Sequence, residues 1–197
     1  ARGRGARMTV KLFTFALSPK PMHFLGKVIV ITGASDGIGA ELARQLAREG
    51  ARLALAARSP ERLEAVADEC RASGAEACAI PTDVTCDEDC ARLMARTVER
   101  YGAIDALVAN AGVSMHANFD EITDFGTFER LFRINALGTV YCVRHAWDAL
   151  KASRGLVIGV SSLAGRTGVP GRTTYCTSKF AQTGFLEALR IEAAEHG

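Results

Sequence analysis

The stretch from Lys27 to Gly39 constrains the fold of this chain more than any other part of the sequence. A short apolar run rich in β-branched residues is followed by glycines at positions 33, 37 and 39 and then by a helical pattern. This order predicts a strand, a tight turn and a helix. The glycines let the backbone turn sharply and approach a ligand, while a helix beginning near Gly37 offers free N–H groups and a positive dipole. The turn suits an anionic dinucleotide, although its Gly-x-x-x-Gly-x-Gly spacing departs from the common fingerprint, and a purely structural turn is the alternative.

Strand-like and helix-like segments alternate through the rest of the chain. We expect strands over residues 28–32, 52–57, 76–80, 106–110 and 156–161, with helical patterns between them. Such alternation predicts an α/β fold, a Rossmann-like doubly wound parallel sheet with helices on both faces. Of the 197 residues 48% are hydrophobic and 23% are charged, which is enough apolar content for one domain with a sizeable core.

Charge and cysteine usage exclude some classes of partner. The net charge of +2 gives no basic field, so we expect no nucleic acid partner. The six cysteines form no Cys-x-x-Cys motif and show no Cys/His ligand spacing. We therefore expect no metal site, and reduced thiols in a cytoplasmic protein.

The end of the second expected strand predicts which dinucleotide is bound. An acidic side chain about 20 residues after the glycine turn selects NAD, whereas an arginine accommodates the 2′-phosphate of NADP. Here Ala57 has no carboxylate, and Arg58 supplies a planar fork that suits phosphate. We predict NADP(H). The alternative is that Arg58 only caps the strand end. Asp36 adds a negative charge near the expected phosphates, which disfavours binding of an anion there.

A tyrosine and a lysine near the carboxyl end indicate proton transfer. Tyr175 and Lys179 are four residues apart, so on a helix they lie on one face. A phenol titrates near pH ~10, and a cation close to it lowers that pKa toward the range in which general acid–base catalysis is efficient. Ser162, thirteen residues before Tyr175, would supply a hydroxyl to the oxygen on which charge develops. The alternative is a surface helix that happens to carry both residues.

Together these motifs resemble the short-chain dehydrogenase/reductase family from about Phe24 to the end of the chain. The stretches around Ser162 and Lys179 are most similar to the compact, hydroxysteroid-dehydrogenase-like branch. The resemblance implies an NADP(H)-dependent oxidoreductase that interconverts a secondary alcohol and a ketone, with Tyr175 as the general acid/base. Two alternatives remain: a non-catalytic NADP-binding sensor or scaffold, and an epimerase or dehydratase of the extended branch, which shares Tyr-x-x-x-Lys.

The resemblance also implies roles for individual residues. Asp83 would bond the adenine amino group, and Lys179 would bond the nicotinamide ribose. Asn135 would hold a water that links Lys179 to solvent. The alternative is an amide that packs between helices and bonds to the backbone, because a buried amide without partners costs roughly 1–3 kcal/mol. The residues expected to be catalytic are Asn135, Ser162, Tyr175 and Lys179. Those expected to bind the cofactor are Gly33, Ser35, Asp36, Gly37, Ile38, Gly39, Arg58, Asp83, Val84, Asn110, Ala111, Gly112, Tyr175 and Lys179.

The expected partners follow from the residues near the site and from the resemblance. An apolar bias after Gly112 and after Ser162 indicates a small lipophilic carbonyl or alcohol as substrate. The family resemblance suggests a homodimer or homotetramer packed through helices near residues 126–151 and 174–194. We expect no membrane partner.

The two ends of the chain differ from the family pattern. Residues 1–21 contain no acidic residue, and their apolar patch is too short for a membrane span. We expect a flexible or non-native extension there, followed by a single dinucleotide-binding catalytic domain over residues 22–197. Further strands follow this point in the family, so we expect the domain to be incomplete at its carboxyl end, with its last strands missing.

Overall fold

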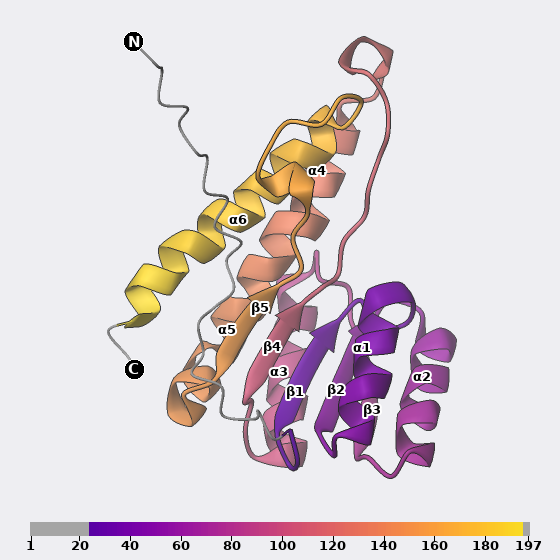
Figure 1. Cartoon of the computed structure of the whole chain (residues 1–197), viewed down its shortest axis with the longest axis vertical. Coiled ribbons are helices and arrows are strands. Elements are labelled where there is room, and N and C mark those ends of the chain that lie inside the picture. Colours follow the sequence, from indigo (N-terminus) through magenta and orange to yellow (C-terminus); the bar gives the residue numbers. More distant parts are fainter. Residues whose placement is uncertain (1–23, 195–197) are drawn as a thin grey trace, which may run out of the picture.

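Five parallel strands form one sheet in the computed structural model, which describes residues 24–194 of the chain (Figure 1). They are β1 Val28–Thr32, β2 Arg52–Ala57, β3 Ala77–Pro81, β4 Ala106–Ala109 and β5 Leu156–Gly159. Their order across the sheet is β3-β2-β1-β4-β5, and all neighbours are parallel. The order reverses between β1 and β4, and ligands of open α/β sheets bind at the carboxyl ends of strands beside such a reversal. The extension predicted over residues 1–21 lies outside the described residues.

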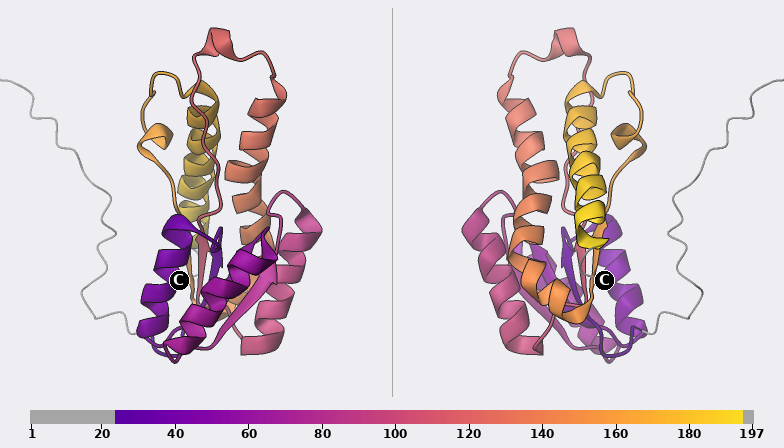
Figure 2. Two further views of the ribbon diagram at one scale, coloured as in Figure 1. Left: turned by 90° about the vertical axis from the view of Figure 1, so that its right-hand side faces the viewer. Right: turned by 90° about the vertical axis from the view of Figure 1, so that its left-hand side faces the viewer.

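The helices of the described region join these strands. The longer ones are α1 Gly37–Arg48, α2 Pro60–Ala72, α3 Asp87–Tyr101, α4 Gly126–Phe132, α5 Gly138–Ser153 and α6 Thr173–Ala193. Single turns are η1 Phe119–Glu121, η2 Arg133–Leu137 and η3 Leu163–Gly165. Helices cover both faces of the sheet, so the predicted α/β, Rossmann-like fold is confirmed (Figure 2).

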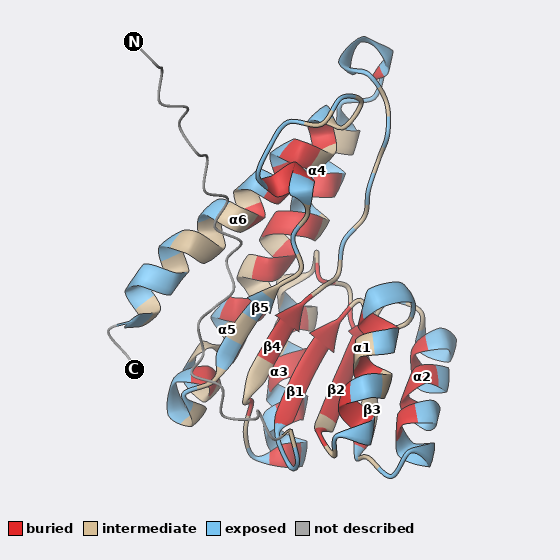
Figure 3. Cartoon of the chain, in the orientation of Figure 1, coloured by how far each residue is buried: buried red, intermediate tan, exposed pale blue. Residues whose placement is uncertain are grey.

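The alternation of side chains along β1 shows why this sequence needs helices on both faces. Val28 and Val30 pack into the core formed with α3 and α5. Ile29 and Ile31 point the other way, into the core formed with α1 and α2. All of these side chains are buried, so a continuous apolar run is what a parallel strand with two covered faces requires (Figure 3).

Four strand boundaries differ from the predicted ranges. β3 begins and ends one residue later than predicted, and β4 and β5 end earlier, at Ala109 and Gly159. The chain leaves β4 because the Asn110 N–H donates to the Thr32 hydroxyl (3.1 Å) beside the glycine turn. The pairing of β5 with β4 therefore ends at Ala109 and Gly159. The Ala109 carbonyl oxygen still accepts from the Val160 N–H (3.0 Å).

α4, η2 and α5 form one continuous helical segment with a π-helical turn, η2, in its middle. Turns of this kind occur often at functional sites. α6 packs along α4 and η2, and the views agree that these helices rise beyond the carboxyl edge of the sheet (Figures 1 and 2). Among residues 24–194 no helix is long and apolar enough to cross a bilayer.

Candidate functional site

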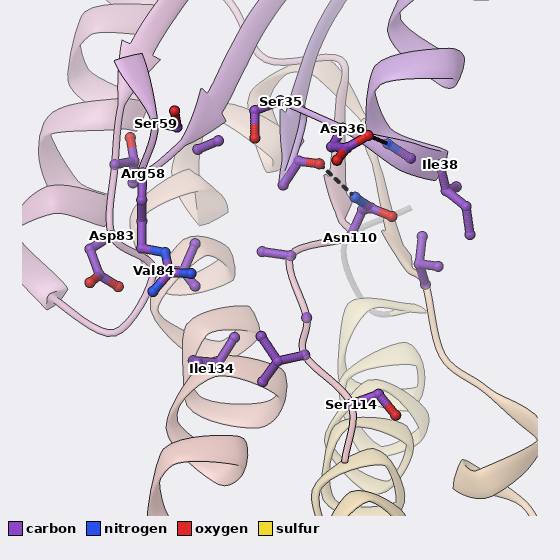
Figure 4. Close-up of a pocket in the computed structure, with 18 of the residues that line it drawn as sticks. Ser35, Asp36, Ile38, Arg58, Ser59, Asp83, Val84, Asn110, Ser114 and Ile134 are labelled. Atoms are coloured by element: carbon purple, nitrogen blue, oxygen red, sulfur yellow. Dashed lines mark hydrogen bonds between the residues drawn. The ribbon is translucent and has the colours of Figure 1, made fainter. Parts of the chain in front are cut away.

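A cleft of about 870 Å³ lies at the carboxyl ends of the strands, beside the reversal of strand order (Figure 4). Its walls come from the segments that follow β1, β2, β3, β4 and β5, and from η2 and α6. All the residues predicted for the site line this cleft except Gly39, Asn135 and Ser162. The fold therefore brings together residues as far apart in the sequence as Gly33 and Lys179.

The glycine turn after β1 forms one end of the cleft. Gly33 and Gly37 have φ angles of 65° and 54°, which favour glycine. A Cβ atom on Gly39 would lie 2.4 Å from the Gly33 carbonyl oxygen, so Gly39 serves the close packing of α1 on the turn instead of lining the cleft. The Asp36 carboxylate accepts a hydrogen bond from the Gly37 N–H (2.7 Å) and caps α1.

Asn110 holds this turn from the end of β4. Its side-chain amide donates to the carbonyl oxygens of Thr32 (2.9 Å) and Gly33 (3.2 Å). A dashed line from Asn110 marks one of these bonds in Figure 4. The Thr32 hydroxyl in turn accepts from the N–H groups of Asn110 (3.1 Å) and Ala111 (3.0 Å). These bonds make the floor of the cleft and the glycine turn one rigid unit.

Two arginines stand at the end of β2. The exposed Arg58 side chain extends from the strand end toward Val84 (Figure 4). The sequence interpretation missed Arg62, which also lines the cleft: its guanidinium lies 3.6 Å from the Asp36 carboxylate and donates to the Ser59 hydroxyl (3.4 Å). Arg62 lies in the first turn of α2, directly after the end of β2, and this place in the sequence was the signal that could have identified it.

The segment after β3 forms the wall opposite the glycine turn. The Asp83 carboxylate accepts from the backbone N–H (2.9 Å) and the hydroxyl (2.8 Å) of Thr85. The Asp83 N–H donates to Asp89 (2.9 Å), and this bond together with the Arg92 ion pair lowers the pKa of the Asp89 carboxyl. Val84 packs against α5, where a Cβ atom on Gly138 would lie 2.8 Å from the valine side chain.

Tyr175 and Lys179 lie one turn apart on α6, and both line the cleft. The Lys179 side chain is only 4% exposed. Its ammonium donates to the Val160 carbonyl oxygen (2.8 Å) and to the Gln182 side-chain oxygen (3.0 Å). Burial disfavours the charged form and lowers the pKa of Lys179 to about 8. The predicted pairing on one helix face is therefore present at the cleft wall.

Asn135 is fully buried in the π-helical turn η2 and does not line the cleft. Its amide oxygen accepts from the Val113 N–H (2.8 Å), and its amide nitrogen donates to the Val113 carbonyl (2.9 Å) and to the Ser178 hydroxyl (2.9 Å). The side chain thus ties the segment after β4 to α6. This is the packing arrangement that the sequence analysis left as the alternative, and a role for Asn135 in holding a water stays a prediction.

The two adjacent serines after β5 are placed differently. Ser162, the residue predicted to act, caps η3 and accepts from the Ala164 N–H (3.2 Å). Ser161 lines the cleft, and its hydroxyl lies 3.0 Å from that of Thr183. The structure brings Ser161 to the cleft wall, and the role predicted for Ser162 stays a prediction.

Two segments next to the cleft residues Ser114 and Tyr175 are bonded to each other. The Ala117 N–H donates to the Gly171 carbonyl oxygen (2.9 Å). Arg172 donates to the Ser114 hydroxyl and to the Met115 carbonyl oxygen (3.2 Å), and its guanidinium carbon lies 5.9 Å from the centre of the Tyr175 ring. Other cleft residues that the site prediction omitted are Ala57, Ser59, Thr82, Val113, Ile134 and Val160.

The cysteines of the chain are all free and fall within the described region. Two of them, Cys90 and Cys142, are buried between α3 and α5 with their sulfur atoms 3.7 Å apart. The contact with Cys90 and the burial raise the pKa of the Cys142 thiol. Across residues 24–194, no group of three or more His, Cys, Asp and Glu side chains is arranged to hold a metal ion.

Comparison with known proteins places these features in a family. The family model described as short chain dehydrogenase matches residues 27–197. The chain is 41% identical over 168 residues to 11-beta-hydroxysteroid dehydrogenase-like 4A of Arabidopsis thaliana, covering 85% of this chain and 56% of that protein. The chain spans about half the length of the curated relatives it matches.

Solved structures give the same result. An alcohol dehydrogenase from the archaeon Thermococcus sibiricus, complexed with 5-hydroxy-NADP, superposes with a TM-score of 0.81 at 35% identity, over 84% of this chain and 71% of that one. An NAD+-bound xylitol dehydrogenase superposes with a TM-score of 0.85 at 31% identity, over 88% of this chain and 67% of that one. The family match, the curated relatives and the shared fold agree with the resemblance in the motifs, and the chain belongs to the short-chain dehydrogenase family.

Proposed function

We propose that this protein is an NADP(H)-dependent oxidoreductase that interconverts a secondary alcohol and a ketone, with Tyr175 as the general acid/base. One observation carries the proposal: Tyr175 and Lys179 line the same cleft as the glycine turn after β1. A proton-transfer pair and a phosphate-binding turn in one cleft are what a dinucleotide-dependent oxidoreductase requires.

The residues of the cleft fit a dinucleotide. A Cβ atom on Gly33 would meet the Cα atom of Ala111 at 2.8 Å, whereas one on Gly37 would meet no atom within 4 Å, so open space lies beside the turn. The amino end of α1 faces this space with its positive dipole. Gly33, Gly37 and Ile38 would hold the phosphates, and Asp83 and Val84 would hold the adenine. The negative charge of Asp36 would repel the phosphates. This charge is partly balanced because the carboxylate is paired with Arg62 and accepts from the Gly37 N–H.

The protein side of the reaction is the movement of one proton. The nicotinamide, when bound, supplies or accepts the hydride. The Tyr175 hydroxyl gives its proton to the carbonyl oxygen in reduction, and in oxidation the Tyr175 phenolate takes a proton from the alcohol. The Lys179 ammonium stabilises the phenolate that forms, because an opposite charge nearby favours the ionised phenol. A serine hydroxyl after β5, Ser162 with Ser161 beside it, orients the substrate oxygen.

The preference for NADP rests on this chain's own residues. One solved relative is complexed with 5-hydroxy-NADP and another is bound to NAD+, so family membership leaves both cofactors open. Ala57 has no carboxylate for a ribose hydroxyl, whereas Arg58 offers an exposed guanidinium group directly after β2, and Arg62, paired with Asp36, lines the cleft from α2. Guanidinium groups bind phosphate in a bidentate way, which favours a 2′-phosphate.

We further propose a small lipophilic carbonyl or alcohol as the substrate, because Val113 and Ile134 line the cleft. An apolar surface on α6 that includes Phe180 and Ile191, 45% and 66% exposed, supports a homodimer or homotetramer. The six free cysteines support a cytoplasmic location, and the net charge of +2 offers nothing for nucleic acid.

Calorimetric titration of the chain with NADPH and, separately, with NADH tests the proposal. We expect NADPH to bind at least about tenfold more tightly, since one charge-assisted bond to phosphate contributes about 1.5 kcal/mol or more. Tighter binding of NADH would contradict the assignment of Arg58. Failure of a cooperatively folded chain to bind either dinucleotide would contradict the proposal as a whole.

A turnover assay with NADPH and a panel of ketones then separates the enzyme from the alternatives. Reduction of at least one lipophilic ketone is the expected result. Tight NADPH binding with no conversion of any ketone, and no oxidation of the matching alcohols with NADP+, would favour a sensor or scaffold. Conversion of a substrate without net change in the cofactor would favour an epimerase or dehydratase.

A further inference from the structure

Lys179 has a side-chain partner for which the proposed reaction has no role. Gln182, on the next turn of α6, is 0% exposed, and its amide oxygen accepts from the Lys179 ammonium at 3.0 Å. A fully buried amide is costly unless its donors and acceptor are bonded, so its position next to a buried ammonium calls for a physical reason.

The far side of the Gln182 amide is also bonded. Its nitrogen donates to the Thr139 hydroxyl on α5 (3.0 Å), and that hydroxyl donates to the Asn135 carbonyl oxygen (3.4 Å). The Thr139 proton is directed at a carbonyl, which can only accept, so the hydroxyl oxygen is left to accept from Gln182. The hydrogen-bond chain therefore fixes the orientation of the amide, with its oxygen toward Lys179.

The contact with Gln182 limits how many N–H donors of Lys179 can point into the cleft. An ammonium group has three N–H donors and no acceptor. The Val160 carbonyl oxygen takes one donor at 2.8 Å and Gln182 takes a second at 3.0 Å. One N–H is left for the cleft, and its direction is set because the other two are held.

The surroundings of the ammonium are otherwise uncharged. From the segment after β4, a Cβ atom on Gly112 would lie 3.6 Å from the Lys179 nitrogen and 3.2 Å from the Asn135 amide oxygen. Val160 faces it from the end of β5, and Tyr175 is the titratable side chain one turn earlier on α6. Within the described residues the named groups on the neighbouring elements carry no formal charge, so the Gln182 dipole is the side-chain group that stabilises the ammonium.

We propose that Gln182 is a positioning residue for the reaction: it holds the Lys179 ammonium, in its charged form, with one N–H directed into the cleft. The reaction step rests on the proposed function, whereas the contact itself can be tested without turnover. Gln182 would act only through Lys179, with no contact to substrate or cofactor.

Titration of Lys179 by NMR is the first test. The chain has five lysines, so a spectrum with labelled lysine ε-carbons is simple, and Lys179→Met assigns the signal. Gln182→Leu keeps the size of the side chain but removes the acceptor, so we expect the Lys179 midpoint to fall by about one pH unit. Gln182→Glu places a carboxylate at the same distance, so we expect the midpoint to rise by about one unit or more.

Kinetics with the same variants test the reaction step. We expect kcat for ketone reduction at neutral pH to fall about tenfold in Gln182→Leu, and the alkaline limb of its pH profile to move in the direction of the NMR midpoint. The matched control is Gln45→Leu on the exposed face of α1, which should match the unmodified chain in both measurements.

The outcomes are distinct. NMR midpoints in both Gln182 variants that equal that of the unmodified chain would overturn the proposal. Shifted midpoints with unchanged kcat and pH profile would also overturn it, because the contact would then be structural only. Absence of turnover in the unmodified chain would refute the proposed function, while the NMR midpoints would still decide whether Gln182 holds the charged lysine.

Thr139→Val provides a second route to the same network if a Gln182 variant fails to fold. It removes the hydroxyl that fixes the amide orientation while leaving Gln182 in place. We expect a smaller shift of the Lys179 midpoint in the direction of Gln182→Leu, and a midpoint shifted the opposite way would contradict the proposal.

Discussion

The half of the sheet around β2 and the half around β5 are built on different physical principles. In β2 the central residues Leu53, Ala54, Leu55 and Ala56 are 0% exposed, between helices on both faces. In β5, at the edge of the sheet, Leu156 and Ile158 are 39% and 44% exposed. The buried polar side chains beside β5 include Asn135, Thr139, Ser178, Lys179 and Gln182.

This difference separates stability from chemistry. Apolar burial tolerates any well-shaped hydrophobic side chain, so the β2 half keeps its fold through many substitutions of similar volume. A buried polar network works only when every donor meets its acceptor, so single changes in the other half remove a specific interaction. The cleft lies between the two halves and takes its glycine turn from one and the side chains of Tyr175 and Lys179 from the other.

The largest effect should come from Tyr175→Phe, in the half of the sheet around β5 with its buried polar side chains (the polar half). The substitution removes the hydroxyl that transfers the proton and leaves the ring in place, so we expect turnover to fall about 10²–10⁴-fold. NADPH affinity by calorimetry and the free energy of unfolding should stay close to those of the unmodified chain. Retained turnover would refute the acid–base role.

A matched pair of core substitutions tests the comparison directly. Leu55→Ala leaves a cavity between two covered faces, and we expect it to lower the free energy of unfolding by about 2–5 kcal/mol. Ile158→Ala removes a similar volume from the half-exposed edge strand, and we expect a loss below about 1.5 kcal/mol. Denaturant unfolding of both variants is the measurement, and equal losses would mean that β5 is as well packed as β2.

The buried lysine should make stability depend on pH. Burial lowers the pKa of Lys179 to about 8, below its ordinary value of 10.5. The cost of burying the charge is therefore fully present below pH 8 and is relieved as the pH rises from about 8 to about 10.5. Relative to Lys179→Met, the unmodified chain should gain at most about 3 kcal/mol of stability over that window. Unfolding measured at several pH values would contradict this if the difference stayed constant.

The smallest effect should come from Arg58, directly after β2, in the half of the sheet around β2 (the apolar half). Arg58→Glu should lower the ratio of NADPH to NADH affinity about tenfold or more, because a carboxylate repels the 2′-phosphate and can accept from a ribose hydroxyl. Arg48→Glu, in the last turn of α1 and outside the cleft, is the charge-matched control. An unchanged ratio in Arg58→Glu would remove the basis for the NADP preference.

The sequence was sufficient to predict the apolar half. A continuous β-branched run, glycines at fixed offsets and a helical pattern are local signals, and they predicted the observed bounds of β1 and the observed start of α1 at Gly37. β2 was also predicted in full, while β3 to β5 were predicted with errors of one or two residues at their ends. The error at the end of β4 arises where the Thr32 hydroxyl accepts from the Asn110 N–H in place of a strand partner.

The polar half shows the limit of this kind of prediction. Tyr175 and Lys179 were found because two residues four positions apart on a helix lie on the same face. Arg62, Ser161 and Gln182 were missed because their importance depends on what other elements place beside them. A glutamine in a helical segment is ordinarily an exposed residue, and nothing near it in the sequence shows that a buried ammonium and a threonine of another helix will surround it.

The sequence by itself determined the α/β class, the glycine turn and the placement of Tyr175 and Lys179 on one helix face, because each depends on the spacing of residues within one strand or helix. Only the tertiary structure decided that Asn135 bonds Val113 and Ser178, that Ser161 reaches the cleft, and that Gln182 holds Lys179. Hydrogen bonds between distant segments require donor and acceptor within about 3 Å, and chain folding alone brings them to that distance.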